Sequence, residues 1–265
     1  MASLAAGDAF PPLTVSVSAA ANERYWGSAG VDHPLLRAGA LYPPIAANLT
    51  VLLVQQTVGE ALLHTAQTIV CRATDECGVR VHVTGAVSER FERRGREYAV
   101  VDATVAGGGG LLWESRATFT STRAATTNTG ARAERAAAPE PVDPGAPHRT
   151  IHLDAAMLRA YSRAGNFHSD PDEARRLGMP GLVAQGMQVC GPAYGVLLDA
   201  WGVEFLERGR FGARFVGMVV EDQTVDAAVE VDSRANGARF EVRDDRGRVV
   251  ALGDASRVMR SAGRG

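Results

Sequence analysis

Two long segments of the chain, residues 44–58 and 182–201, are apolar on nearly every face of a helix. A helix of this kind has to be buried, because none of its faces can be left in water. Gly59 and Gly202 follow the two segments and are well placed to cap the ends of the helices. Pro192 lies inside the second segment and removes a backbone donor, so we expect a kink there. The rest of the chain is therefore predicted to enclose two buried helices.

Strand-like segments follow each of these helices and are separated by short turns, several of which contain Gly. They are residues 64–72, 80–91, 97–105 and 111–119 after the first helix, and 214–220, 224–231, 238–243 and 249–256 after the second. A strand at 13–17 and a short helix at 19–26 precede the first buried helix, and a helix at 155–163 precedes the second. Each half of the chain thus predicts a sheet wrapped around one helix.

The two halves also resemble each other in sequence. The stretch 20–34 matches 155–171, and 43–51 matches 180–189, at an offset of about 135 residues. Duplication of one unit explains this repeat more simply than two unrelated domains do.

A different composition separates the halves. Residues 121–149 hold almost no large apolar side chains and are rich in Ala, Thr, Pro and Gly, so they cannot bury enough surface to offset the entropy lost on ordering. We therefore predict an N-terminal unit over 1–120, a linker over 121–149 and a C-terminal unit over 150–265.

Composition excludes several classes of function. The net charge of −2 gives no basic surface for nucleic acid, and the absence of lysine excludes Schiff-base chemistry through that residue. Cys71, Cys77 and Cys190 show no metal-ligand spacing. No signal peptide and no apolar run of the roughly 20 residues that a membrane span needs are visible. These features predict a cytoplasmic protein without a nucleic-acid or membrane partner; they leave open whether it forms a homodimer.

Polar residues are concentrated just before the second buried helix, where side chains and helix N-terminal amides can face one substrate atom. The segment resembles the hydratase motif of the MaoC-like, (R)-specific enoyl-thioester hydratases, whose pattern is roughly Y-x-x-S-G-D-x-N-P-x-H-x-D, then an Ala, a Gly and H-G-M. The residues that carry the resemblance are Tyr161, Asn166, His168, Asp170, Ala174, Gly178, Gln185, Gly186 and Met187.

The resemblance implies an α+β protein with the double hot-dog fold, in which two antiparallel sheets each wrap a long helix. It also implies a hydro-lyase that acts on an enoyl or 3-hydroxyacyl thioester of coenzyme A or of an acyl carrier protein, without a metal or redox cofactor. His168 would be the acid/base, the Gly186 amide would hold the thioester carbonyl, and Asn166 would contact water or substrate. The predicted substrate-binding residues are Tyr161, Asp170, Gln185 and Met187.

One part of the motif is absent. The family's aspartate falls on Ala164 or Arg163, depending on the alignment, and neither residue can act as a base at neutral pH. The family's second histidine is Gln185 here. The resemblance therefore also allows isomerisation or a Michael-type ring closure on a specialised metabolite, or an acyl-binding subunit without catalysis.

Each candidate residue has a structural alternative. His168 can be a loop histidine that caps a turn, Asn166 a turn residue, and Gly186 a position of close packing. Tyr161 is suited to the core, and Asp170 to an N-cap.

The remaining polar residues are assigned less specific roles. The first half carries a degenerate copy of the motif, with Leu36 in place of the histidine. Asp32 and His33 of this copy are expected to serve in a turn or a cap. We expect structural roles for His64, His82, His148 and His152. Two arginine clusters are expected on solvated faces, with phosphates of coenzyme A or an acidic carrier protein as the alternative ligand: Arg93, Arg94 and Arg96, and Arg208, Arg210 and Arg214.

Overall fold

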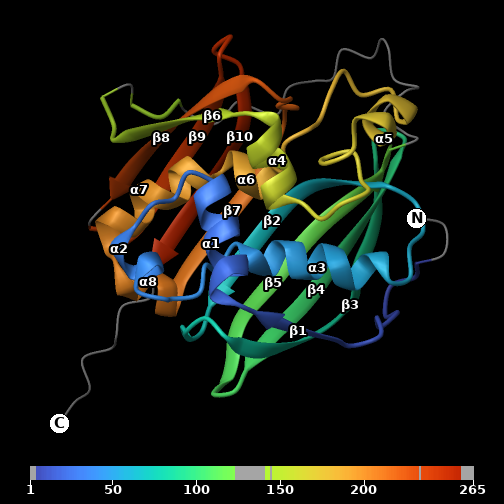
Figure 1. Cartoon of the computed structure of the whole chain (residues 1–265), viewed down its shortest axis with the longest axis horizontal. Helices are drawn as coiled ribbons and strands as arrows, with labels where there is room; N and C mark the ends of the chain where they lie inside the picture. Colours follow the sequence, from blue (N-terminus) through green and yellow to red (C-terminus); the bar gives the residue numbers. More distant parts are fainter. Residues whose placement is uncertain (1–3, 123–140, 144, 233, 258–265) are drawn as a thin grey trace.

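A computed structural model describes residues 4–122, 141–143, 145–232 and 234–257. Its centre is one continuous antiparallel sheet, in which the strand order is β1-β3-β4-β5-β2-β7-β10-β9-β8-β6 (Figure 1). In the first half the strands are β1 Leu13–Val17, β2 Leu62–Cys71, β3 Val79–Arg93, β4 Arg96–Gly107 and β5 Gly110–Ser121. In the second half they are β6 His148–Leu153, β7 Gly209–Phe215, β8 Gln223–Asp232, β9 Gly237–Asp244 and β10 Val249–Arg257.

The strand order repeats between the halves. In each half the first strand lies at the outer edge, followed by the third, fourth and fifth, and the second strand lies innermost. The two inner strands, β2 and β7, pair with each other over a register that runs from Ala66 opposite Arg214 to Val70 opposite Arg210. This arrangement is the one expected for a duplicated unit, and it joins the two units through backbone hydrogen bonds.

One helix packs inside each half of the sheet. Helix α3 (Ile45–Gln55) lies against β2, β3, β4 and β5, and helix α7 (Gly191–Trp201) lies against β6, β8 and β9 (Figure 1). Every residue of α7 from Gly191 to Leu198 is buried, as its continuous apolar sequence predicts. The shorter helices are α1 Ala19–Ser28, α2 Pro34–Arg37, α4 Ala155–Tyr161, α5 Pro171–Arg176, α6 Gly186–Val189 and α8 Val203–Arg208.

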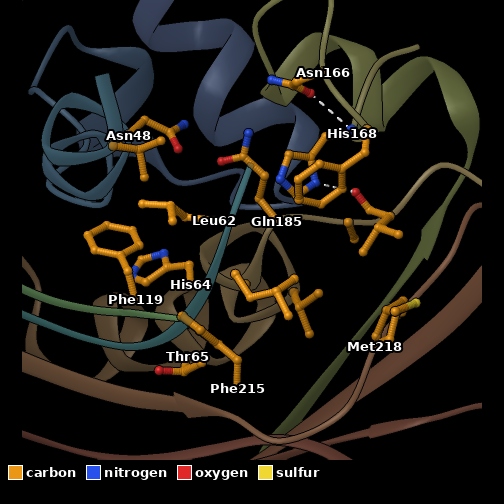
Figure 2. A pocket seen from close by; sticks show the side chains of 18 of the residues that line it. Asn48, Leu62, His64, Thr65, Phe119, Asn166, His168, Gln185, Phe215 and Met218 are labelled. Carbon is orange, nitrogen blue, oxygen red and sulfur yellow. Dashed lines mark hydrogen bonds between the residues drawn. The ribbon is translucent and has the colours of Figure 1, made fainter. Parts of the chain in front are cut away.

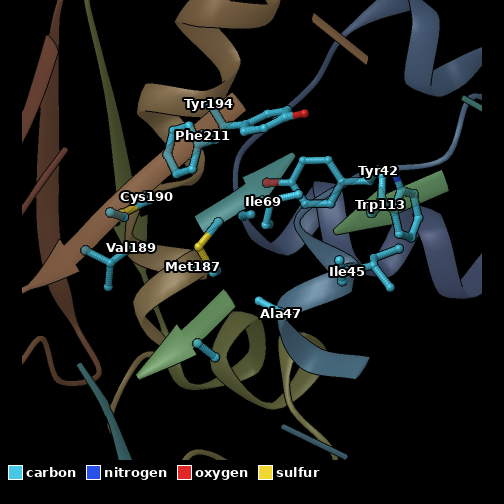
Figure 3. Packing of buried hydrophobic residues seen from close by; sticks show 14 of the residues in the cluster. Tyr42, Ile45, Ala47, Ile69, Trp113, Met187, Val189, Cys190, Tyr194 and Phe211 are labelled. Atoms are coloured by element: carbon cyan, nitrogen blue, oxygen red, sulfur yellow. The ribbon is translucent and has the colours of Figure 1, made fainter. Parts of the chain in front are cut away.

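The larger of two hydrophobic clusters among the described residues crosses from one half to the other. Figure 3 shows Tyr42 and Trp113 of the first half close to Tyr194 and Met187 of the second, and the rings of Tyr42 and Tyr194 meet edge to face at 5.4 Å. Burial of aromatic rings against each other stabilises such a contact by more than their area alone. The two units are therefore parts of one packed body.

The second buried helix differs from the prediction. The expected segment 182–201 is extended at its start, where Val183 forms an isolated bridge with Val220, and helix begins only at Gly186. Cys190 separates α6 from α7, and Pro192 lies in the first turn of α7. A proline in a first turn loses no hydrogen bond, because its N–H would have no helical acceptor. Pro192 therefore starts a helix instead of kinking one.

Three other boundaries differ. Strand β7 ends at Phe215, one residue after Arg214, where the prediction placed its beginning, and α8 was not predicted. Strand β6 begins at His148, inside the predicted linker. Residues 123–140 and 144 of that linker lie outside the described residues, whereas Val142 and Ala146 are buried. Within the described chain, no helix combines the length and the apolar character that a membrane crossing needs.

Candidate functional site

A cavity of about 350 Å³ lies between the two halves (Figure 2). The first half contributes side chains from α3, β2 and β5, including Asn48, Leu62 and Phe119, and the second half contributes the loop after α4, the start of α6 and the end of β7. Most of the wall is apolar. The polar residues His168, Asn166, Gln185 and Gly186 gather at one part of it, which brings together most of the predicted site.

His168 is oriented by a strong backbone contact. Its Nδ1 lies 2.6 Å from the carbonyl oxygen of Val183, so Nδ1 carries the proton and donates it to that oxygen. In the neutral ring the lone pair is then on Nε2. Burial lowers the pKa of His168 to about 4, against the opposing effect of the Val183 carbonyl. At neutral pH the ring is therefore uncharged, and Nε2 can accept a proton.

Asn166 holds the loop that carries this histidine. Its side-chain oxygen accepts from the backbone N–H of His168 at 2.9 Å (Figure 2). The same oxygen accepts from the Ser162 hydroxyl at 3.1 Å. The oxygen of Asn166 is thus used inside the loop. Its amide nitrogen remains as the group that can face a ligand in the cavity.

Gly186 is the first residue of α6, so its amide has no acceptor within the helix. A side chain at this position would collide with Phe215, because a Cβ would lie 2.6 Å from that ring. Gly186 thus permits Phe215 to pack directly on the helix start. Both predicted uses of this glycine, as an amide donor and as a position of close packing, are compatible with this geometry.

Tyr161 lines the cavity but is fully buried, with its ring edge-on to Tyr25 at 5.3 Å. Among the described residues its hydroxyl has no hydrogen-bond partner, and burial raises the pKa of Tyr161 well above its usual value. The phenol therefore stays protonated.

Two predicted substrate-binding residues lie away from the cavity wall. Asp170 is the N-cap of α5, where its carboxylate accepts from the amides of Asp172 at 2.9 Å and Glu173 at 3.4 Å. Met187 points into the hydrophobic core beside Cys190 and Tyr194 (Figure 3). Neither residue is in the cavity wall: the Asp170 carboxylate serves in a cap, and the Met187 side chain is buried in the core, so substrate contact by these two residues stays a prediction.

No carboxylate replaces the missing aspartate within the described lining of the cavity. Ala164 and Arg163 are exposed, and Arg163 lies at the cavity wall. Asp154, another carboxylate close to the motif in sequence, caps α4 by accepting from the Met157 amide at 2.8 Å. Among the described residues of the wall, the imidazoles are therefore the candidates for a base.

The copy of the motif in the first half does not reach the cavity. His33 caps α2, with its Nδ1 accepting from the Leu35 amide at 3.2 Å, and Asp32 forms an ion pair with Arg37. Leu36 is buried in the core. These residues therefore have the local structural roles, in a turn or a cap, that were predicted for them.

The cavity wall also contains a histidine that was expected to be structural and an arginine from one of the two predicted clusters. His64 projects from β2 and lies with Phe119 and Phe215 in the wall (Figure 2). Arg96 belongs to the first arginine cluster and also lines the cavity, whereas Arg208 and Arg210 of the second cluster form ion pairs with acidic neighbours. The position of His64 depends on strand pairing across 55 residues, so no local signal could have identified it.

Comparisons with known proteins identify the fold. No protein-family model matches the sequence, and no curated protein matches it. Solved structures match over almost the whole chain. HtdX of Mycobacterium tuberculosis is similar with a TM-score of 0.70 and 16% identity, over 94% of this chain and 100% of that one.

Two further structures agree. A MaoC-like dehydratase from Phytophthora capsici has a TM-score of 0.72 at 15% identity, over 97% of this chain and 98% of that one. A second Mycobacterium tuberculosis protein, described as having a double hotdog fold, has a TM-score of 0.60 at 14% identity, over 96% and 97%. The chain therefore has the double hot-dog fold, and the predicted resemblance to MaoC-like dehydratases is confirmed at the level of the fold.

Proposed function

We propose that the protein is a hydro-lyase that adds water to an enoyl thioester, or removes it from the 3-hydroxyacyl thioester, with coenzyme A or an acyl carrier protein as the thiol. The observation that carries the proposal is the tautomer of His168. Its Nδ1 is held by the Val183 carbonyl, which leaves Nε2 as a proton acceptor at the wall of an apolar cavity. The fold shared with MaoC-like dehydratases supports the same reaction class.

The reaction needs a base, an acid and a donor for the enolate oxygen. In the hydration direction, His168 Nε2 takes a proton from water while the water oxygen bonds to the β-carbon. The electrons of the double bond move to the thioester oxygen, where the Gly186 amide donates a hydrogen bond. The imidazolium then returns a proton to the α-carbon, so the chemistry balances without a cofactor.

The lack of a carboxylate in the described lining favours a second candidate. An imidazole with a pKa of about 4 is always available as an acceptor at neutral pH, but it is a weak base toward water. The same imidazole and amide can isomerise an enoyl thioester or close a ring by Michael addition. A binding subunit without turnover is the remaining alternative.

The test is to mix the protein with short-chain and medium-chain enoyl-CoA and to follow the absorbance of the conjugated thioester. Bleaching with formation of the 3-hydroxyacyl product supports hydration. The variant His168→Gln should lower kcat/KM by at least ~10²-fold, the usual contribution of a general base. His152→Gln is the matched control, because His152 lies on the exposed face of β6, where its Nδ1 is 3.2 Å from the Thr224 hydroxyl.

The other outcomes separate the alternatives. Loss of absorbance with a cyclic product, or movement of the double bond without uptake of water, identifies the second candidate. A thioester that raises the melting temperature without any reaction identifies a binding subunit. Full activity of the His168→Gln variant removes the assignment of His168.

A further inference from the structure

His64 reaches the cavity because strand β2 contains a bulge. The pairing of β2 with β5 shifts between His64, opposite Phe119, and Ala66, opposite Thr118, which leaves Thr65 as an extra residue. Farther along β2, Gln67 and Ile69 are buried on the inner face. Strict alternation from these residues would place His64 on the outer face, but one extra residue turns it inward. Bulges of this kind occur frequently beside active sites.

Aromatic rings on two sides hold the imidazole of His64 in place. The imidazole stacks on Phe119 and meets Phe215 edge to face, each at 5.0 Å between centroids. Phe215 in turn packs on Gly186, the proposed amide donor. Among the described residues, the buried Nε2 of His64 has no hydrogen-bond partner. A buried polar atom without a partner destabilises the folded state, so its presence calls for an explanation such as a functional role.

The two histidines line the same cavity. Burial, the largest cause, lowers the pKa of His64 to about 4. Hydrogen bonds with the Ala66 backbone and the Gln67 side chain raise it, and a positive charge on His168 lowers it. The other titratable or charged side chains in the described lining are Tyr25, Tyr161, Arg96 and Arg163. His64 belongs to the first half and His168 to the second, so the pair exists only because the two units share one cavity.

We propose that His64 is a second catalytic residue, which binds the reacting water, or the product hydroxyl, together with His168. It occupies the functional place of the absent carboxylate. This inference rests on the proposed hydro-lyase function. The water donates one proton to His168 Nε2 and is held by a hydrogen bond with the His64 ring as its oxygen attacks the β-carbon. In the reverse direction the same contact holds the departing hydroxyl, and no further reactant is required.

The first test uses turnover. His64→Gln should lower kcat for hydration by ~10-fold to ~10²-fold, with a smaller effect on KM, because the side chain contacts the reacting water and not the acyl chain. In the wild type, kcat/KM should fall with a slope of two as both histidines become protonated at low pH, and in His64→Gln with a slope of one. A merely structural role would leave the slope unchanged. His82→Gln is the control, since His82 lies on the exposed face of β3, with its Nδ1 3.0 Å from the Thr14 hydroxyl.

The second test is independent of turnover and of the stability of any variant. Nitrogen-15 NMR of the histidine rings in the wild-type protein should show shifts of both His64 and His168 on addition of 3-hydroxyhexanoyl-CoA. Hexanoyl-CoA, which lacks only the hydroxyl, should shift His64 much less.

The outcomes distinguish the two proposals. A wild type that hydrates enoyl-CoA and a His64→Gln variant with the same kcat and pH slope overturn the role of His64 and leave the proposed function intact. A wild type without turnover whose His64 signal responds selectively to the hydroxylated thioester overturns the proposed function and supports the contact. Binding that leaves His64 unshifted, or no binding of either thioester, overturns the contact.

Discussion

Desolvation governs the chemistry of single residues in the cavity. An imidazole that loses water without gaining a charged partner becomes harder to protonate, and both His64 and His168 have their pKa lowered to about 4 for this reason. In the resembling family a carboxylate would oppose this effect. Here the described lining contains none, so both rings are neutral at pH 7.

The lowered pKa values predict how stability depends on pH. The unfolded chain takes up a proton at each of these histidines near pH 6.5, whereas the folded chain does so only near pH 4. Between these values the unfolded state binds more protons, so the free energy of unfolding should fall as the pH is lowered from 6.5 toward 4. Each histidine contributes at most about 1.4 kcal/mol per pH unit. Urea unfolding at several pH values should show a shallower dependence in His64→Gln and in His168→Gln.

Gly186 offers a second prediction at the scale of one residue. Gly186→Ala places a methyl group against the Phe215 ring, which has to move. We expect a loss of about 1–3 kcal/mol in the free energy of unfolding and weaker binding of acyl thioesters, because Phe215 lines the cavity. Gly27→Ala in α1 is the control. That site has open space for a Cβ, so the change should stabilise the helix by up to about 1 kcal/mol. Chemical denaturation and thioester titration measure both effects; equal behaviour of the two variants would contradict the packing argument.

At the scale of elements, acidic residues in and near the motif stabilise helix N-termini and do not line the cavity. Asp170 stabilises the start of α5, and Asp154 that of α4. We therefore expect Asp170→Ala to lower stability by about 1 kcal/mol while kcat for hydration changes little. Asp170→Asn keeps a side-chain oxygen for the cap and should be close to the wild type in both measurements. A large loss of kcat in Asp170→Asn, with stability intact, would show that Asp170 takes part in the chemistry after all.

The fold could be predicted because its signals are local and repeated. Each buried helix is apolar on all faces, and the sequence repeat indicates that both halves share one architecture. The errors arose where tertiary contacts override local pattern. Residues 182–184 are apolar enough to continue a helix, but a bridge between Val183 and Val220 keeps them extended. Strand β7 contains Gly209 and Gly212, which weaken any strand prediction, although pairing with β2 and β10 on both sides determines its conformation.

The site was predictable to a lesser extent for the same reason. His168, Asn166, Gln185 and Gly186 belong to one continuous motif, and the fold places them together at the cavity. The approach of His64 depends on a bulge at Thr65 and on the pairing of the two halves. Neither feature leaves a pattern that can be read from neighbouring residues.

At the scale of the whole molecule, the two repeated halves form one packed body. Strands β2 and β7 join the two sheets, the core is continuous, and the cavity takes its wall from both halves. Gln188 provides a specific link. Its side chain is fully buried, and its amide nitrogen donates to the carbonyl of Ser28 in the first half and to that of Met157 in the second, each at 3.0 Å.

This link predicts cooperative unfolding. Gln188→Ala removes the buried donor that the two carbonyls share, at a cost of about 2 kcal/mol. The loss should lower the urea midpoint equally for probes in both halves, because a single domain unfolds as one unit. Fluorine NMR of fluorotryptophan-labelled protein provides such probes in the buried Trp113 of the first half and Trp201 of the second.

The control is Gln56→Ala, which removes one exposed hydrogen bond to the Pro11 carbonyl and should change stability by less than about 0.5 kcal/mol. If Gln188→Ala shifts the Trp201 transition and leaves the Trp113 transition in place, the halves unfold separately. His64 and His168 would then belong to two halves that fold independently of each other. If both transitions move together, the cavity is a property of the whole fold, because neither half can keep its wall of the cavity after the other has unfolded.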